Sequence, residues 1–275
     1  MELISLLLRS VQYEFIQKAL LSGTFLAISS ALLGVFLALQ RKSLISDGLS
    51  HVSFATAALA LLIGLSPLII SLPLVILASI LINKLVSHAH IYSDSAIGLV
   101  SSLSIAVGVL IVNVGSGFNV DIYSYLFGSI LAISPIETAL CIAASLITIV
   151  LIIIFFNDLF LISYDEDYAR ISGINVIMLD LTFSTVQSVV IVVGIKIVGA
   201  MLISSLIIFP AITSLQIARS FKSMIIFSVS ISLLSVIIGI FSSFVFNAPT
   251  GATIVLLNGI LFLIFFILNK IFKFK

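Results

Sequence analysis

The residues best suited to chemistry in this chain are Asp47 and His51, four positions apart at the head of a long apolar run. On a helix, residues i and i+4 share a face, so the carboxylate and the imidazole would point the same way. Both groups are ligands that suit Zn²⁺ or Mn²⁺. Two ligands cannot close a structural zinc site, which needs four. The spacing therefore indicates half of a metal site, of the loose kind from which a transported ion can leave.

A structural explanation of this pair stays open at the sequence level. Ser46 or Asp47 can cap a helix that begins near Gly48, where a carboxylate also suits the positive end of the helix dipole. His51 would then be a polar residue facing a neighbouring helix. Against this explanation, an acid and a histidine that enter a membrane segment are costly, and the default interpretation of such residues is functional.

A second group of possible metal ligands is His88, His90 and Asp94, in a segment that we expect to be a cytoplasmic loop. Most histidines in such loops are simply solvated. The Asp47–His51 pair is therefore the stronger candidate.

The most charged stretch of the chain is Tyr164–Gly173. Its notable residues are Asp165, Glu166, Asp167, Ala169, Arg170 and Gly173. A solvated loop is the plain explanation, and a short helix that ends at Gly173 and docks onto a soluble partner is the sharper one. Neither involves catalysis. The chain has no nucleophile with a nearby histidine and no phosphate-binding glycine loop, so we expect no enzyme activity in it.

The composition indicates which elements must position these residues. The chain has 275 residues, of which 61% are hydrophobic and only 8% are charged, whereas soluble domains carry about a quarter charged residues. Apolar runs of about 20 residues recur along it, which predicts an all-α polytopic membrane protein. Helices are favoured because each backbone group in lipid must find its partner within its own segment. No basic patch indicates nucleic-acid binding.

We predict nine membrane-spanning helices in one membrane domain, residues 1–275, and a half-buried helix at one rim over Ile122–Ile133. Eight spans, with the N-terminus inside, is the alternative if two adjacent runs form one broken helix. The nine expected spans are Ala19–Leu39, Leu49–Leu65, Leu68–Leu85, Ala96–Val114, Thr138–Phe156, Ile177–Ile195, Ile197–Leu215, Met224–Phe246 and Ala252–Ile271.

Positive charges orient the predicted spans, because cytoplasmic loops carry an excess of lysine and arginine. With nine spans, one side of the membrane collects Arg41, Lys42, Lys84, Arg170, Arg219, Lys222, Lys270, Lys273 and Lys275. We therefore expect this side and the C-terminus to be cytoplasmic.

Several motifs, in order along the chain, resemble those of the membrane permease subunit of ATP-binding-cassette (ABC) importers for zinc and manganese. Each motif alone is weak, but together they cover nearly the whole chain. The motifs are Arg41-Lys42 followed by Asp47-Gly48-Leu49-Ser50-His51, then Val120–Ala132, Asp165–Gly173, Lys196–Ala200 with Ser204–Ala211, and Pro249–Val255.

This resemblance implies the fold of a type II importer permease, as a homodimer in the cell membrane of a prokaryote. It also implies two cytoplasmic ATPase subunits that use ATP and an extracytoplasmic metal-binding protein. Asp47 and His51 would be ligands on the ion pathway, and the region of about 161–175 would couple to the ATPase. Tyr125, Phe127 and Gly128 would belong to an outer gate. The cargo would be Zn²⁺, with Mn²⁺ next, and no permanently bound cofactor is expected.

Symmetry adds one inference. If Asp47 and His51 face the axis of a twofold dimer, the dimer offers two carboxylates and two imidazoles, a full tetrahedral set.

Two alternative functions remain. A permease of the same fold for a metal chelate such as a siderophore would use the pair structurally. A channel or secondary transporter would work without ATP, although the docking segment argues against it.

Overall fold

The computed structural model describes residues 12–88, 92–115, 125–128, 134–200 and 202–272. Over these ranges the protein is all-helical, which confirms the predicted fold class. The helices are α2 (Glu14–Leu39), α3 (Ile45–Leu62), α4 (Pro67–His88), α5 (Ser93–Val114), α7 (Pro135–Ile154), α8 (Phe156–Tyr164), α9 (Glu166–Ile171), α10 (Val176–Val198), α11 (Ile203–Leu215), α12 (Phe221–Phe246) and α13 (Thr250–Phe272).

Among the residues described, eight helices are long and apolar enough to cross a membrane: α2, α3, α4, α5, α7, α10, α12 and α13. The alternative count of eight spans therefore fits, and nine spans are not confirmed. The difference lies in the predicted span Ile197–Leu215. The chain leaves α10 at Val198, takes a positive φ of 98° at Gly199 and becomes helical again at Ile203. The 13 residues of α11 extend only about 20 Å, less than the roughly 30 Å hydrocarbon core.

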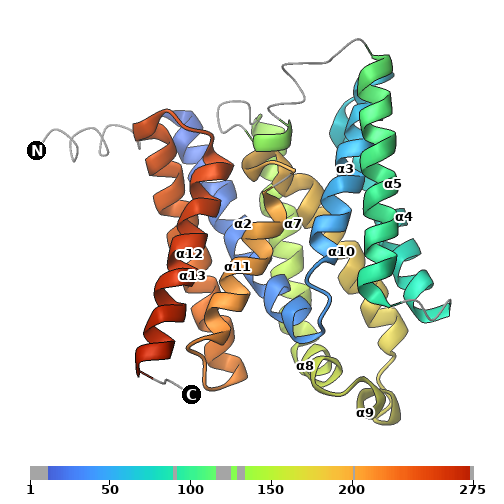
Figure 1. Cartoon of the computed structure of the whole chain (residues 1–275), viewed down its shortest axis with the longest axis vertical. Coiled ribbons are helices and arrows are strands. Elements are labelled where there is room, and N and C mark those ends of the chain that lie inside the picture. Colours follow the sequence, from blue (N-terminus) through green and yellow to red (C-terminus); the bar gives the residue numbers. More distant parts are fainter. Residues whose placement is uncertain (1–11, 89–91, 116–124, 129–133, 201, 273–275) are drawn as a thin grey trace, which may run out of the picture.

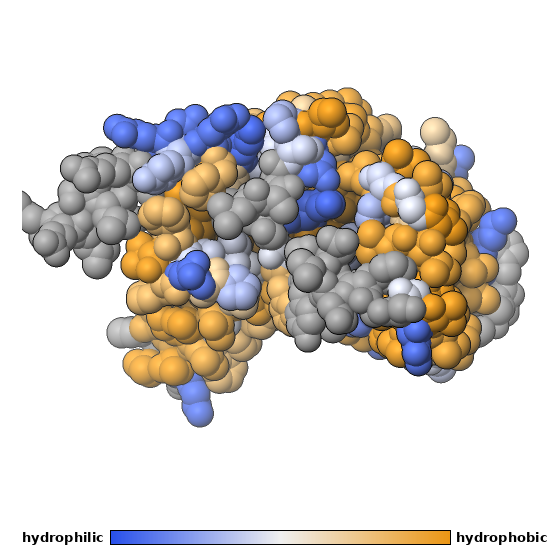
Figure 2. Space-filling view, turned by 90° about the horizontal axis from the view of Figure 1, so that it is seen from above, coloured by the Kyte–Doolittle hydropathy of each residue, from blue (hydrophilic) through white to orange (hydrophobic). Residues whose placement is uncertain are grey.

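The central helices differ from the peripheral ones in burial. We compare the most apolar 18-residue stretch of each helix. The buried share of this stretch is 72% in α2 and 67% in α3, but only 17% in α5 and in α13. The peripheral helices present leucine, isoleucine and valine outward, as expected for surfaces that contact lipid. Hydrophobic residues accordingly dominate the visible flanks in Figure 2. The helix that carries Asp47 and His51 therefore lies inside the bundle.

The bundle has two distinct ends (Figure 1). The short helices α8 and α9 lie at one end, which we call the α9 end, and α2 begins at the opposite end. The last residues of α13 also lie at the α9 end. The turn between α2 and α3 lies toward this end as well, and α2 contacts α8 there.

Candidate functional site

Asp47 and His51 lie together in the first two turns of α3, as the spacing predicts. His51 Nε2 is 3.5 Å from Asp47 Oδ2. Ser204, in the first turn of α11, donates a hydrogen bond of 3.3 Å to Asp47 Oδ1. The N-cap of α3 is Leu44, and its side chain makes no capping bond. Capping by Ser46 or Asp47 is therefore not how this helix begins, and the carboxylate of Asp47 is directed to His51 and Ser204 instead.

The pair is partly exposed, although the residues beside it at the start of α3 are buried. The side chain of Asp47 is 47% exposed and that of His51 is 25% exposed, while their neighbours Ser46, Gly48, Leu49 and Ser50 are buried. Both polar groups are therefore partly accessible although they lie on a central helix. Within the described residues, no third histidine, cysteine, aspartate or glutamate joins them. Among the described residues, this pair alone is therefore too small a set to surround a metal ion.

Buried polar side chains hold the start of α3 in place. Ser50 Oγ donates to the carbonyl oxygen of Asp47 at 2.7 Å. Gln187 of α10, only 1% exposed, donates from Nε2 to Ser46 Oγ at 3.2 Å. The role of Gln187 and the contact between Ser204 and Asp47 were not predicted from the sequence. Gln187 carries a signal that could have identified it, because it is a polar amide within an apolar membrane span.

The expected outer gate residues lie at the end of the bundle opposite α9. Part of the predicted rim helix Ile122–Ile133 is outside the described residues, but Tyr125–Gly128 is described. The Tyr125 hydroxyl lies 2.6 Å from Ser53 Oγ and donates to the Ser53 carbonyl at 3.2 Å. Ser53 is on α3, two residues after His51. The backbone N–H of Ala200 donates to the Tyr125 carbonyl at 2.9 Å. Tyr125 thus joins this segment to α3 and to the α10–α11 connection.

Gly128 and Gly199 bring two backbones into direct contact at this end. Both have positive φ, 74° and 98°, and a Cβ on Gly128 would lie 2.6 Å from the carbonyl oxygen of Ile197. An L-residue with positive φ costs roughly 1–2 kcal/mol even without a clash. Only glycine fits here.

We therefore expect Gly128→Ala to destabilise the protein by at least about 2 kcal/mol, which lowers its melting temperature in detergent by about 5 °C. Gly98→Ala is the matched control, because a Cβ at this position of α5 meets no atom within 4 Å. It should melt at or above the wild-type temperature. Equal melting of both variants would contradict the close approach at Gly128.

The charged stretch Tyr164–Gly173 contains a short helix, α9. Asp165 caps it by accepting a hydrogen bond of 2.9 Å from the backbone N–H of Tyr168. Arg170 lies 2.6 Å from Glu166, and this contact raises the pKa of the Arg170 guanidinium. Gly173 follows with a φ of 86°, a conformation typical of a helix end. Asp167 lies in the first turn. The helix is thus built from the residues that the sequence singles out.

One side of α9 anchors it to the bundle and the other is exposed. Ala169 is fully buried in a small apolar cluster with Ile162, Val176 and Leu179. Tyr168 is 58% exposed and Ile171 is 85% exposed. Large apolar side chains beside charged ones at the end of a membrane bundle are a surface suited to a soluble partner.

The second group of possible metal ligands cannot be assembled from the described residues. Asp94 lies in the first turn of α5. His90 and the side chain of His88 lie outside the described part of the chain. The group is left as an expectation.

An all-helical bundle with eight helices long enough to span a membrane among its described residues, a partly exposed Asp–His pair on a central helix and a short charged helix at one end are features expected of a membrane transport permease. The chain belongs to the ABC 3 transport family, whose family model matches residues 12–269. This confirms the resemblance seen in the sequence motifs.

Individual proteins show the same relationship over the whole length. The chain is 31% identical to the manganese import system permease protein ScaB of Streptococcus gordonii over 259 residues, 94% of this chain and 93% of ScaB. It is 31% identical to the high-affinity zinc uptake system membrane protein ZnuB of Buchnera aphidicola over 255 residues, 92% of this chain and 97% of ZnuB. The solved structure of PsaBC from Streptococcus pneumoniae in complex with Fab matches with a TM-score of 0.84 and 31% identity, covering 96% of this chain and 95% of the PsaBC chain.

Proposed function

We propose that this chain is the permease subunit of an ATP-driven importer that moves Mn²⁺ or Zn²⁺ into the cytoplasm. The observation that carries the proposal is the open Asp47–His51 pair on a central helix. The two ligands are within 3.5 Å of each other and suit either ion. Relatives of similar identity are named for manganese and for zinc, which supports both ions as cargo.

In this proposal the working permease is a homodimer. A twofold axis beside α3 brings two Asp47 carboxylates and two His51 imidazoles to one place. This arrangement fits the exposure of both side chains in a single chain. Four ligands from two copies complete a tetrahedral site, and the site opens when the copies move apart. A resident cofactor has no part in this cycle.

The two ends of the bundle take different roles. Arg41, Lys42 and Arg170 belong to the α9 end, which agrees with a cytoplasmic position for that end and for the C-terminus. There α9, with Asp165, Glu166, Asp167, Ala169, Arg170 and Gly173, docks onto the ATPase subunit. At the other end Tyr125, Phe127 and Gly128 form part of the outer gate, where an extracytoplasmic protein delivers the ion. The chain acts as a single permease domain.

The test is ATP-dependent uptake by vesicles that carry the permease with its ATPase and metal-binding protein. We expect radioactive Mn²⁺ or Zn²⁺ to accumulate only with ATP, and each free ion to compete with the other. Accumulation of a siderophore-bound metal with no uptake of the free ions would contradict the proposal and favour a chelate permease. Uptake at the same rate without ATP would favour a channel or a secondary transporter.

A further inference from the structure

The turn between α2 and α3 is the direct route from the α9 end of the bundle to the Asp47–His51 pair. It comprises Gln40–Leu44, and Asp47 follows within one helical turn. The turn is tight: Arg41 has a positive φ of 57°, the Lys42 N–H bonds back to the Leu37 carbonyl at 2.9 Å, and the Ile45 N–H bonds to the Lys42 carbonyl at 3.1 Å. A displacement of this turn therefore moves the first turn of α3.

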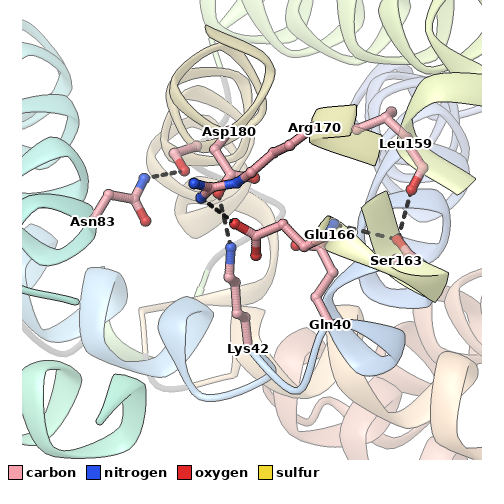
Figure 3. Close-up of polar contacts among 9 residues, drawn as sticks. Gln40, Lys42, Asn83, Leu159, Ser163, Glu166, Arg170 and Asp180 are labelled. Carbon is pink, nitrogen blue, oxygen red and sulfur yellow. Dashed lines mark hydrogen bonds and ion pairs between the residues drawn. The ribbon is translucent and has the colours of Figure 1, made fainter. Parts of the chain in front are cut away.

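Two side-chain contacts hold this turn from both sides of α9 (Figure 3). Gln40 Nε2 donates to Ser163 Oγ at 3.3 Å, and Ser163 belongs to α8, just before α9. Lys42 Nζ lies 3.1 Å from Asp180 Oδ2, and Asp180 belongs to α10, just after α9. Ser163 is itself oriented by a 2.7 Å bond to the Leu159 carbonyl. The turn is thus attached to the chain on either side of the docking helix.

The Lys42–Asp180 ion pair is the stronger of the two contacts. Its side chains are only 23% and 27% exposed, so water screens it less than a surface pair. Lys42, Asp180, Glu166 and Arg170 line one cavity of about 390 Å³, and the charge of Asp180 also acts on Arg170. Asp180 therefore interacts with the turn through Lys42 and with α9 through the charge of Arg170.

Helix α10, which carries Asp180, also contacts α3 directly. Asp180, Ser184 and Gln187 are spaced i, i+4 and i+7 along α10, so they lie on one face. Gln187 holds Ser46 and Ser184 accepts a bond of 2.7 Å from Asn83 of α4. One face of α10 thus contacts the turn at Lys42 and the first turn of α3 at Ser46.

We propose that Lys42 and Asp180 are positioning residues that transmit displacement of α9 to the Asp47–His51 pair during transport. The ion pair joins the helix that follows α9 to the turn that leads into the metal ligands. It touches neither the ion nor ATP. The inference rests on the proposed function, because it assigns a coupling role within that transport cycle.

The variants Lys42→Met and Asp180→Asn, in the complete transporter in vesicles, test this role. We expect metal uptake to fall about tenfold, within the range of typical coupling energies, with equilibrium binding of Mn²⁺ and ATP hydrolysis within twofold of wild type. More ATP is then consumed per ion transported. The charge-exchanged double variant Lys42→Asp/Asp180→Lys should restore at least half of the uptake. Lys18→Met is the matched control, because it breaks the 2.7 Å Lys18–Glu14 ion pair at the other end of α2.

Three results would overturn the role of the pair: single variants with wild-type uptake, uptake and Mn²⁺ binding lost together, or a double variant no better than the single ones. If a single variant does not fold, the double variant alone decides the question. Its ATP consumption per transported ion should be near that of wild type if the pair has the proposed role, and clearly higher if it does not. Failure of the proposed function is recognised separately, since the wild-type transporter would then accumulate no free metal with ATP.

Discussion

Removal of either proposed metal ligand, Asp47 or His51, should strongly reduce transport while leaving the fold intact. We expect Asp47→Ala and His51→Ala each to reduce ATP-dependent Mn²⁺ or Zn²⁺ uptake by about a hundredfold. Loss of a group that only orients a metal ligand lowers affinity or activity by up to about a hundredfold, and loss of the ligand itself should cost at least as much. Both side chains are partly exposed, so the variants should express and melt like wild type. Uptake assays in vesicles, with a melting curve of each purified variant, make the measurement.

Two further variants separate a ligand role from a structural one. Asp47→Asn keeps an oxygen that can accept the Ser204 hydrogen bond but removes the charge, and it should lose uptake almost as fully as Asp47→Ala. Glu14→Ala is the matched control, since Glu14 is an acidic residue in the first turn of α2, and it should transport normally. Wild-type uptake by Asp47→Asn would mean that the pair is structural.

The second large effect is expected at the exposed face of α9. Ile171 is 85% exposed in the single chain, so Ile171→Glu should leave the permease folded. If Ile171 is buried against the ATPase subunit, a carboxylate in its place carries a desolvation cost. We expect the ATPase to bind at least about tenfold more weakly, as for loss of an interface hot spot. Co-purification and uptake should fall together.

Leu65→Glu provides the control for this prediction. Leu65 is 50% exposed and lies in the turn between α3 and α4, at the other end of the bundle. The variant carries the same added charge and should retain the ATPase. Retention of the ATPase by Ile171→Glu, or its loss from both variants, would show that α9 does not form the docking surface.

Local patterns in the sequence predicted local features well. The i, i+4 spacing brought Asp47 and His51 together on α3, and the charged stretch ending at Gly173 is the helix α9. The recurrence of apolar runs identified the membrane fold. These features depend on spacing within one helix or on hydropathy averaged over one span, and both can be read from a single sequence.

Contacts between distant segments could not be predicted in the same way. Ser204 lies 157 residues from Asp47 and Gln187 lies 141 residues from Ser46, and no periodicity relates such positions. Lys196 likewise pairs with Glu137 of α7 at 3.2 Å, across 59 positions of the sequence. Packing of the bundle decides these partners.

The predicted span Ile197–Leu215 failed for a different physical reason. Its hydropathy is continuous, so an average over the window indicates one membrane helix. The break after Val198 comes from backbone geometry, because Gly199 packs against the backbone of Leu126–Gly128 with a positive φ. In the sequence, only the two glycines, Gly128 and Gly199, indicate this contact. Each of them alone is also compatible with a continuous helix.

The most direct test of the central claim is the stoichiometry of metal binding to the purified permease. Titration of the purified permease with Mn²⁺ or Zn²⁺, followed by calorimetry and by metal analysis of the protein peak, counts ions per chain. We predict one ion per two chains, and no binding by Asp47→Ala. One ion per chain, or binding that persists without Asp47 and His51, would contradict a site completed by two copies.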